Sequence, residues 1–249
     1  RGQLVLRHHG KDFFVLGDGE EVITELTHTI HAWKSNSNDP KSRNHLLENL
    51  SEIEGVYVPA LYEVTKDSHG HQLLEPKNEL APKVVEKRTI ADLEEWPYPK
   101  NQLVPITEVV HDRLNVEVFR GCTRGCRFCQ AVMITRPVRE RSVEQVRTMV
   151  KSGIERTGYD EVALTSLSTA DYSDIEKAVE LTTDDTLSCG QVSVSLPSLR
   201  VDAFTVGIAA TIQGVKRTGL TFAPEAGSWR MRQVINKLIT EEDLYGAVE

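Results

Sequence analysis

The sequence predicts an α/β fold built on a parallel β-sheet. From residue 115 onward, short apolar runs of strand length alternate with segments in which apolar residues recur at helical spacing. Four such strand–helix units follow one another, and capping residues precede the helical segments. Consecutive units of this kind form parallel strands joined by right-handed crossovers. The functional residues of such sheets gather at the carboxyl ends of the strands.

The first two units carry the clearest patterns. The first strand is predicted over 116–119, and its helix begins near Ser142, which forms a capping box with Gln145. The second strand is predicted over 161–165, and a second capping box begins its helix at Ser173. The residues expected to be buried on these two helices are Val143, Val146, Met149, Val150, Ile175, Ala178 and Val179.

The third and fourth units are predicted from shorter patterns. The third strand spans 191–196, and Asp202 caps a helix that ends at Gly214. The fourth strand spans 219–223 and leads through an acidic, glycine-containing turn into a helix. That last helix carries Met231, Val234 and Ile235.

The region before residue 114 is predicted to be less regular. A short strand over 12–16 leads into a helix, and a second helix is expected over 44–50. A strand from 55 to 64 is interrupted at Pro59, and the charged, proline-rich stretch 65–103 reads as a connector with one β-like run near its middle, at 83–88. The apolar residues expected on one face of the first helix are Val22, Ile23, Leu26 and Ile30.

Composition indicates an ordinary globular chain. Of the 249 residues, 39% are hydrophobic and 27% are charged, which is enough apolar material for a sizeable core. No apolar run approaches the roughly 20 residues that span a bilayer, and no signal-peptide pattern is present, so we expect a cytoplasmic protein without a membrane partner. The net charge of -8 argues against broad nonspecific binding of nucleic acid, although it leaves room for a specific RNA substrate.

The ends of the chain predict a fragment. The sequence begins at Arg1 without a methionine. A helix-start pattern, with Thr240 and Asp243 in capping positions, begins only a few residues before Glu249.

Three of the four cysteines lie within one short stretch. Cys122, Cys126 and Cys129 have the spacing C-x3-C-x2-C and directly follow the first predicted strand. A disulfide framework is a poor explanation, because three thiols cannot all pair with one another. Structural zinc usually takes four ligands, and the nearest other candidates are His111 and Cys189. Three thiolates suit a [4Fe-4S] cluster with one iron left open, while zinc and simple packing remain as alternatives.

The cysteine loop resembles that of a known superfamily. The spacing of the cysteines, the aromatic Phe128 directly before the last of them and the preceding strand are similar to the cluster loop of the radical S-adenosylmethionine (SAM) superfamily. One branch of that superfamily, which carries an N-terminal cobalamin-binding-like domain and is related to the methylthiotransferases, is similar over roughly residues 10–249. The runs that carry this second resemblance are 120–130, 136–142, 158–162, 195–202 and 220–228.

The resemblance implies a fold and a division into domains. Radical SAM domains are typically partial TIM-like barrels of six strand–helix units, so this chain would hold an incomplete parallel (β/α) barrel. Residues 1–45 would be the C-terminal remnant of the cobalamin-binding-like domain, 46–113 a linker region and 114–249 the N-terminal part of the barrel. His8 and His9 do not match the D-x-H-x-x-G pattern of an axial cobalt ligand, so cobalamin in the full-length protein is left open.

The same resemblance implies cofactors and a reaction. Cys122, Cys126 and Cys129 would bind three irons of a [4Fe-4S] cluster, and the methionine moiety of SAM would bind the fourth. An electron from a reductant such as flavodoxin or ferredoxin would cleave SAM to methionine and a 5′-deoxyadenosyl radical. The substrate could be RNA, protein or a small molecule. A non-catalytic iron–sulfur or zinc module, structural or electron-transferring, and an inert fragment of the enzyme are the alternatives.

Five residues are implied as SAM contacts. Phe128 would lie against the adenine, although its ring could equally plug the base of the loop. Ser166 and Ser168 stand where many members carry Gly-Gly-Glu for the SAM amino group. Glu225 and Ser228 resemble a turn that approaches SAM, and the alternative for Glu225 is a favourable charge at a helix N-terminus.

Several arginines make the cysteine region basic within an acidic chain. They would ease reduction of a negatively charged cluster, or bind the SAM carboxylate or an anionic substrate. A solvated helix face is the alternative for at least half of them. These residues are Arg120, Arg124, Arg127, Arg136, Arg139 and Arg141.

Overall fold

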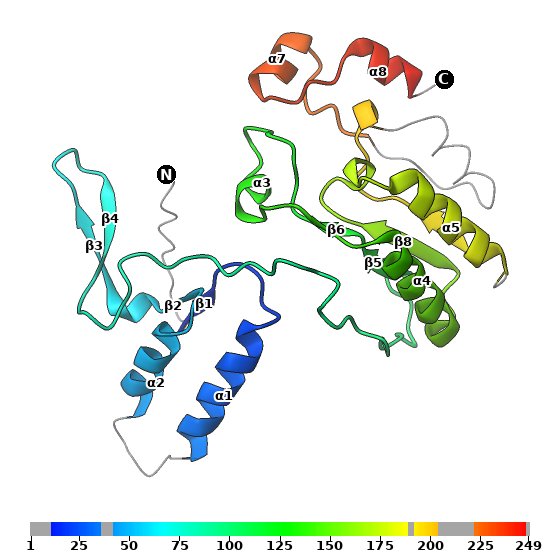
Figure 1. Ribbon diagram of the computed structural model, residues 1–249. Coiled ribbons are helices and arrows are strands. Elements are labelled where there is room, and N and C mark those ends of the chain that lie inside the picture. The colour runs from blue at the N-terminus through cyan, green and yellow to red at the C-terminus, as the bar shows by residue number, and fades with distance from the viewer. Residues whose placement is uncertain (1–10, 36–41, 189–191, 204–221, 248–249) are drawn as a thin grey trace. The chain divides into compact units, whose positions relative to one another are not determined.

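The computed structural model describes residues 11–35, 42–188, 192–203 and 222–247. The chain divides into two compact units, 1–91 and 92–249 (Figure 1). Within the described residues, no helix is both long enough and apolar enough to cross a membrane.

The first unit is built on two helices and a short pair of strands. Helix α1 spans Val22–Ser35 and helix α2 spans Ser42–Ser51, and the two pack together. Strand β1 (Phe14–Val15) pairs antiparallel with β2 (Val56–Tyr57). The core of this part consists of Val22, Leu26, Leu47, Leu50, Val56 and Val58.

One side chain of α1 departs from the predicted buried face. Val22 and Leu26 are buried as expected, and Ile30 packs against them, but Ile23 is 56% exposed. Val22, Leu26 and Ile30 follow one another at a spacing of four, whereas Ile23 lies about 100° around the helix from Val22. The short β1–β2 pair and α2 cover only the first of these faces.

A hairpin lies in the stretch that the sequence predicted as a connector. The 3-10 helix η1 (Pro59–Leu61) interrupts the strand at Pro59 as predicted, and β3 (Tyr62–Lys66) then pairs antiparallel with β4 (Gln72–Pro76). The carboxylate of Asp67 accepts backbone N–H bonds at the tip of this hairpin from His69 and His71, each at 2.8 Å. The hydrogen bonds of the turn and the pairing with β3 therefore form β4, whose own sequence does not alternate between apolar and polar residues. The β-like run at 83–88 contributes an isolated bridge between Gly17 and Arg88.

The second unit contains a parallel sheet. Strands β5 (Leu114–Glu117), β8 (Glu161–Thr165) and β9 (Ser193–Ser195) lie in the order β5-β8-β9, and both pairings are parallel. Helices α4 (Val143–Thr157) and α5 (Ile175–Ser188) pack on each other and against β5 and β9. The predicted parallel arrangement of the first three strands is confirmed.

The predicted helix stripes form the core of this unit. All seven residues expected to face inward on α4 and α5 are buried, and they pack on apolar side chains of the sheet. Strand β8 has the predicted bounds, and its central residues are fully buried because it lies between β5 and β9. These sheet residues are Leu114, Val116, Val162, Leu164 and Val194.

The helix of the third predicted unit and the strand of the fourth lie largely outside the described residues. This holds for the helix expected over 202–214 beyond the 3-10 helix η3 (Val201–Ala203), and for most of the strand expected over 219–223. Beyond them, α7 spans Trp229–Val234 and α8 spans Glu241–Gly246. Thr240 and Asp243 form the predicted capping box of α8.

Helix α7 buries a cation instead of its apolar residues. Met231 and Val234 are 43% and 47% exposed, and Ile235 lies just beyond the end of the helix. Arg232 is buried, and its Nη1 donates to the carbonyl oxygens of Ala226 and Gly227. The turn that precedes α7 is therefore fixed by this guanidinium.

The N-terminus of α4 has its predicted cap, but a third residue completes it. The Ser142 hydroxyl accepts the Gln145 N–H at 3.2 Å. The Ser142 N–H donates to the carboxylate of Glu94 at 2.5 Å, while the Gln145 side chain donates to the Glu94 carbonyl at 3.1 Å. Glu94 thus takes the position that a reciprocal capping box would give to Gln145.

We expect Ser142→Ala to lower the free energy of unfolding by about 1 kcal/mol, because it removes the acceptor of an orphan N–H at the start of α4. Urea denaturation followed by circular dichroism measures this loss. Thr148→Ala is the matched control, since Thr148 lies on the exposed side of the same helix and donates to the Glu144 carbonyl. Equal losses in the two variants would show that the cap contributes nothing of its own.

Candidate functional site

Two short strands close the ends of the cysteine loop. The predicted strand 116–119 is divided, because β5 ends at Glu117 and β6 (Phe119–Arg120) pairs antiparallel with β7 (Arg139–Glu140). The Val118 N–H still donates to Thr165 of β8 at 3.0 Å. The loop 121–138 therefore leaves and rejoins the molecule at the carboxyl ends of β5 and β8. Strands of two residues have no periodicity to detect, so the sequence did not reveal this clamp.

An aromatic pair fastens the clamp to the core. The rings of Phe119 and Tyr172 are stacked with centroids 6.3 Å apart. The buried Tyr172 hydroxyl donates to the Arg141 carbonyl at 2.7 Å, and burial raises the pKa of Tyr172 to about 12. The base of the loop is thus held by packing and by a hydrogen bond that persists throughout the neutral range.

Gly121 permits the two limbs of the loop to lie against each other. Its φ of +98° belongs to the region that favours glycine. A Cβ at this position would lie 2.9 Å from the carbonyl oxygen of Pro137 and 3.0 Å from that of Thr135. A side chain here would force the limbs apart next to Cys122.

The three predicted ligands are free thiols on this loop. Cys122 is buried, whereas Cys126 and Cys129 are half-buried, and the Cys129 N–H donates to the Cys126 carbonyl at 3.0 Å. Burial raises the pKa of the Cys122 thiol, so binding of a metal there must displace its proton. Within the described residues, no three His, Cys, Asp or Glu side chains are arranged to hold one metal ion. A cubane makes a different demand, since each of three thiolates binds its own iron, and this donor set fits that demand.

Two of the six arginines around the loop, Arg136 and Arg139, hold its backbone. Arg136 donates from Nη2 to the carbonyl of Arg124 at 2.9 Å and from Nε to that of Cys122 at 3.4 Å. The buried Arg139 donates to the carbonyls of Thr135 and Pro137, both at 3.1 Å. These two cations, which were expected to serve the cluster or a ligand directly, therefore shape the loop.

Arg127 links the loop to the segment after α7. Its guanidinium donates to the Val234 carbonyl at 2.6 Å, and its backbone N–H donates to the Ile235 carbonyl at 2.9 Å. The Asn236 side chain returns a bond to the Gly125 carbonyl at 2.8 Å. The middle of the loop is therefore supported from the C-terminal part of the chain as well as from its own base.

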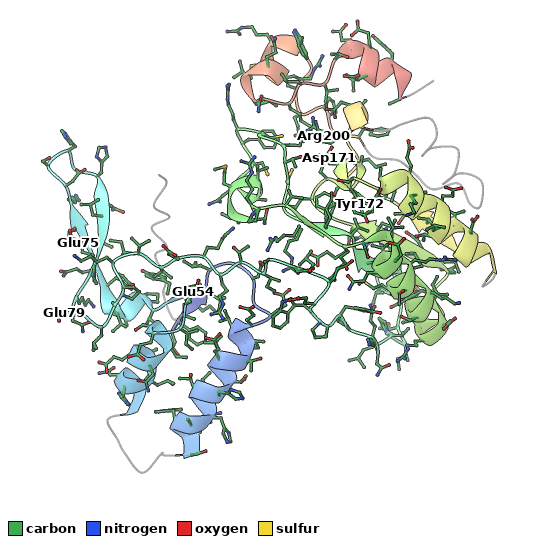
Figure 2. The ribbon with its side chains drawn as sticks, viewed as in Figure 1. Glu54, Glu75, Glu79, Asp171, Tyr172 and Arg200 are labelled. Carbon is green, nitrogen blue, oxygen red and sulfur yellow. The ribbon has the colours of Figure 1, made fainter. Side chains whose placement is uncertain are left out.

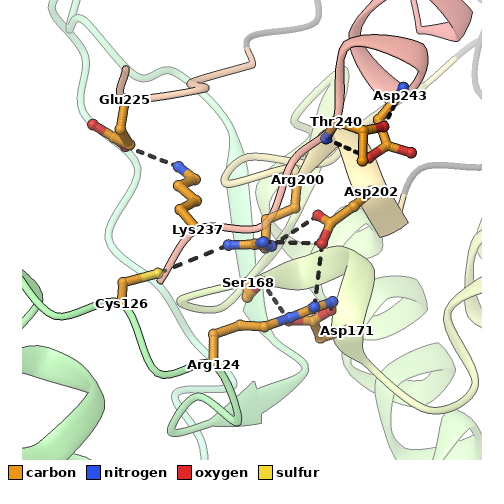
Figure 3. Close-up of polar contacts among 10 residues, drawn as sticks. All are labelled: Arg124, Cys126, Ser168, Asp171, Arg200, Asp202, Glu225, Lys237, Thr240 and Asp243. Atoms are coloured by element: carbon orange, nitrogen blue, oxygen red, sulfur yellow. Dashed lines mark hydrogen bonds and ion pairs between the residues drawn. The ribbon is translucent and has the colours of Figure 1, made fainter. Parts of the chain in front are cut away.

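A chain of ion pairs joins the loop to the ends of β8 and β9 (Figure 3). Arg124 binds the carboxylate of Asp171 through Nε and Nη2, and its Nη1 lies 3.3 Å from Asp202. Arg200 binds Asp202 through Nε and Nη2, both at 2.9 Å. The remaining nitrogen of Arg200, Nη1, lies 3.9 Å from the sulfur of Cys126. Side chains of three consecutive strand–helix units thus form one chain of contacts, which ends at the sulfur of Cys126.

Asp171 is the anchor of this chain. Burial would raise the pKa of its carboxyl, but the hydrogen bonds from Arg124 and Ser168 outweigh burial and hold that pKa below its ordinary value. The same contact with Asp171 raises the pKa of Arg124. The pair is therefore ionised across the neutral range.

The two serines proposed for the SAM amino group are engaged with their own loop. The Ser168 hydroxyl, which is buried, donates to Asp171 at 2.7 Å. The Ser166 hydroxyl lies 3.0 Å from that of Thr169 and accepts the Ser168 N–H at 3.2 Å. The acidic Asp171 thus lies near this strand end, with its carboxylate bound by Ser168 and Arg124.

The other proposed contacts are accessible. Phe128 is 56% exposed, so its ring does not plug the base of the loop. Glu225 has a φ of +68° and accepts a bond from the buried ammonium of Lys237 at 2.9 Å. Ser228 caps α7, where its hydroxyl accepts the Met231 N–H at 3.4 Å.

Sequence reasoning missed the roles of Arg200, Asp171 and Lys237. Figure 2 shows Arg200 and Asp171 close together in the second unit. The sequence held part of the evidence for Arg200 and Asp171, because both follow predicted strands at the functional edge of the sheet. What the sequence lacked was the pairing that brings them to the cysteine loop.

Comparison with known proteins agrees with these features. Residues 116–249 match the family described as the Radical SAM superfamily, and residues 9–59 match the one described as Radical SAM proteins, N-terminal. A protein of Methanocaldococcus jannaschii, described as "Uncharacterized protein MJ0966", is 34% identical over 134 residues, which cover 54% of this chain and 28% of the relative. The chain therefore spans little more than a quarter of the length of this relative.

Proposed function

Because the chain belongs to the radical SAM superfamily, we propose that it reductively cleaves SAM through a [4Fe-4S] cluster held by Cys122, Cys126 and Cys129. The observation that carries the proposal is the placement of three free thiols on one loop, clamped at the carboxyl end of a parallel sheet. The cluster, when bound, supplies the electron that converts SAM to methionine and a 5′-deoxyadenosyl radical. A reductant such as flavodoxin or ferredoxin would deliver that electron.

The side chains of the loop and its neighbours have distinct roles in this proposal. The thiolates of the three cysteines would hold three irons, and the fourth iron would be open to the amino and carboxylate groups of SAM. The exposed ring of Phe128 offers an apolar face to the adenine. Glu225, at the turn before α7, presents a carboxylate for the ribose hydroxyls or the ammonium. Ser166 and Ser228 shape the turns beside them, and the Ser228 hydroxyl, which accepts one N–H, keeps its O–H to donate to SAM.

We propose a role for Ser168 that differs from the one the resemblance implied. Its buried hydroxyl donates to Asp171, and Asp171 in turn binds Arg124 on the cysteine loop. We therefore propose that Ser168 positions Asp171 instead of binding the SAM amino group itself.

We also propose the finer assignment of the chain. Residues 114–249 would be the first part of a partial TIM-like barrel, supported by the parallel order β5-β8-β9. Residues 1–45 would derive from a cobalamin-binding-like domain, with 46–113 as a linker that contributes the β3–β4 hairpin to the first unit and its last part to the second. Methylthiotransferase kinship points to RNA or protein as the substrate, and a small molecule is the remaining class.

Electron paramagnetic resonance tests the proposal directly. We expect anaerobically reconstituted, dithionite-reduced protein to give a [4Fe-4S]+ signal that changes when SAM is added, because SAM binds the open iron. A signal indifferent to SAM would indicate a non-catalytic iron–sulfur module. Retention of one zinc per chain and no iron would indicate a zinc module. Either result would contradict the proposed function.

A further inference from the structure

Arg200 lies beside a cysteine sulfur, and we propose that it sets the reduction potential of the cluster. This inference rests on the proposed function, since it takes Cys122, Cys126 and Cys129 as the cluster ligands. Arg200 follows β9, so it reaches the cysteine loop from a different strand–helix unit (Figure 3). Its Nη1 lies 3.9 Å from Cys126 Sγ, which makes the contact a long, mainly electrostatic one.

Asp202 aims this contact. It accepts from Nε and Nη2 of Arg200, both at 2.9 Å, and so fixes the plane of the guanidinium. The geometry of a planar fork then directs the third nitrogen, Nη1, toward the sulfur of Cys126. A lysine would bring a positive charge to this place, but it has no planar group that can bind Asp202 and direct a further N–H toward the sulfur.

The surroundings keep the charge of Arg200 effective. The side chain is 11% exposed and that of Asp202 is 17% exposed, so water screens them little. Asp202 is shared with Arg124, which in turn binds Asp171. Two guanidinium groups and two carboxylates pair with one another in this chain, and Nη1 of Arg200 is the nitrogen of the chain that faces the sulfur of Cys126.

The physical effect has a definite sign. Reduction adds one electron, so the cluster and its thiolates become more negative by one charge. A cation and N–H donor at a ligand sulfur stabilises that reduced form more than the oxidised form, and hydrogen bonds to sulfur are among the factors that set such potentials. Arg200 therefore raises the reduction potential and makes electron delivery easier. Removing it lowers the potential.

The test is an anaerobic potentiometric titration of the reconstituted protein, read by electron paramagnetic resonance. For Arg200→Gln we expect about a tenfold lower ratio of reduced to oxidised cluster at a fixed ambient potential, which corresponds to about 59 mV for one electron. For Arg200→Lys we expect a smaller shift of the same sign, because the charge remains and the directed N–H is lost. The readout is a potential, so it does not depend on turnover.

Arg113→Gln is the matched control. Arg113 pairs with Glu161 at 3.1 Å, at the amino ends of β5 and β8, which is the opposite edge of the sheet. The substitution changes the net charge by the same amount as Arg200→Gln. We expect its potential to equal that of the wild type.

The outcomes separate this inference from the proposed function. A wild-type protein with no reducible cluster would overturn both. A reducible wild-type cluster whose potential is the same in Arg200→Gln and Arg113→Gln would overturn the inference and leave the proposed function standing. If Arg200→Gln fails to hold a cluster, Arg200→Lys decides: a lowered potential supports the inference, and the wild-type potential shows that Arg200 only shapes the site.

Discussion

Replacing any one of Cys122, Cys126 and Cys129 with alanine is expected to lower the iron bound after anaerobic reconstitution by more than about tenfold, since even changes outside the ligand set lower metal affinity about 10–100-fold. Each thiolate holds a different iron, so the remaining two cannot close the cubane. Iron and sulfide analysis, together with the visible absorbance of the cluster, measures the loss. This effect is the largest that we expect from a single substitution.

Cys189→Ala is the matched control for these variants. It removes the same thiol chemistry from the chain but lies outside the C-x3-C-x2-C motif. We expect it to reconstitute as the wild type does. If a variant at Cys126 kept full iron while Cys189→Ala lost it, the assignment of the ligands to the loop would be contradicted.

The parallel sheet could be predicted because each of its elements carries a local signal. In β8, the run Val162–Leu164 is apolar at every position, as required of a strand covered on both faces, and it is flanked by residues that are only partly buried. On α4, Val143, Val146 and Val150 recur at helical spacing, and all three are buried. Such patterns reflect which residues of an element are buried, so they can be recognised in the sequence before the fold is known.

Other elements depend on partners that are remote in sequence. Strands β6 and β7 have two residues each, and their pairing across the loop is what defines them. Glu94 caps α4 from 48 residues away, in a position for which the sequence offered Gln145. Such contacts are decided by tertiary packing, which local propensity does not contain.

The candidate site also combines features with a local signal and features that depend on remote contacts. The cysteine motif could be found from spacing alone, because the ligands of one cluster on one loop are close in sequence. Asp171 and Arg200 could not be assigned, since each becomes meaningful only when the ends of β8 and β9 lie next to the loop. Ser168 illustrates the converse, because a residue in a suitable position donates its hydroxyl to the neighbouring Asp171.

The anchor of the ion-pair chain carries the second large prediction, which concerns stability. The Asp171 carboxylate binds Arg124 and accepts a hydrogen bond from the Ser168 hydroxyl, and Asp171→Asn removes its charge. The Asp171 side chain is 9% exposed. Breaking a buried pair costs about 3–5 kcal/mol, but Arg124 is 34% exposed and keeps Asp202, so we expect a loss of about 2–3 kcal/mol at pH 7. Urea denaturation under reducing conditions measures it.

The pH dependence distinguishes a lost charge from a local packing defect. The pKa of Asp171 is lower in the folded chain than in the unfolded chain, where it is about 3.9. Stability from such a group is fully present above the unfolded pKa and is lost as the pH falls through the folded pKa. The difference in the free energy of unfolding between the wild type and Asp171→Asn should therefore be constant between about pH 5 and 7. It should shrink as the pH falls below about 4.

Asp184→Asn, at an exposed position on α5, provides the control. It makes the same chemical change away from the ion pairs, and we expect it to alter the free energy of unfolding by less than about 0.5 kcal/mol at any pH. If the loss in free energy of unfolding caused by Asp171→Asn stayed unchanged down to pH 3, the shape of the Asp171 side chain, and not its ionised carboxylate, would hold Arg124. The cysteine loop would then be fixed mainly by the backbone bonds from Arg127 and Arg136.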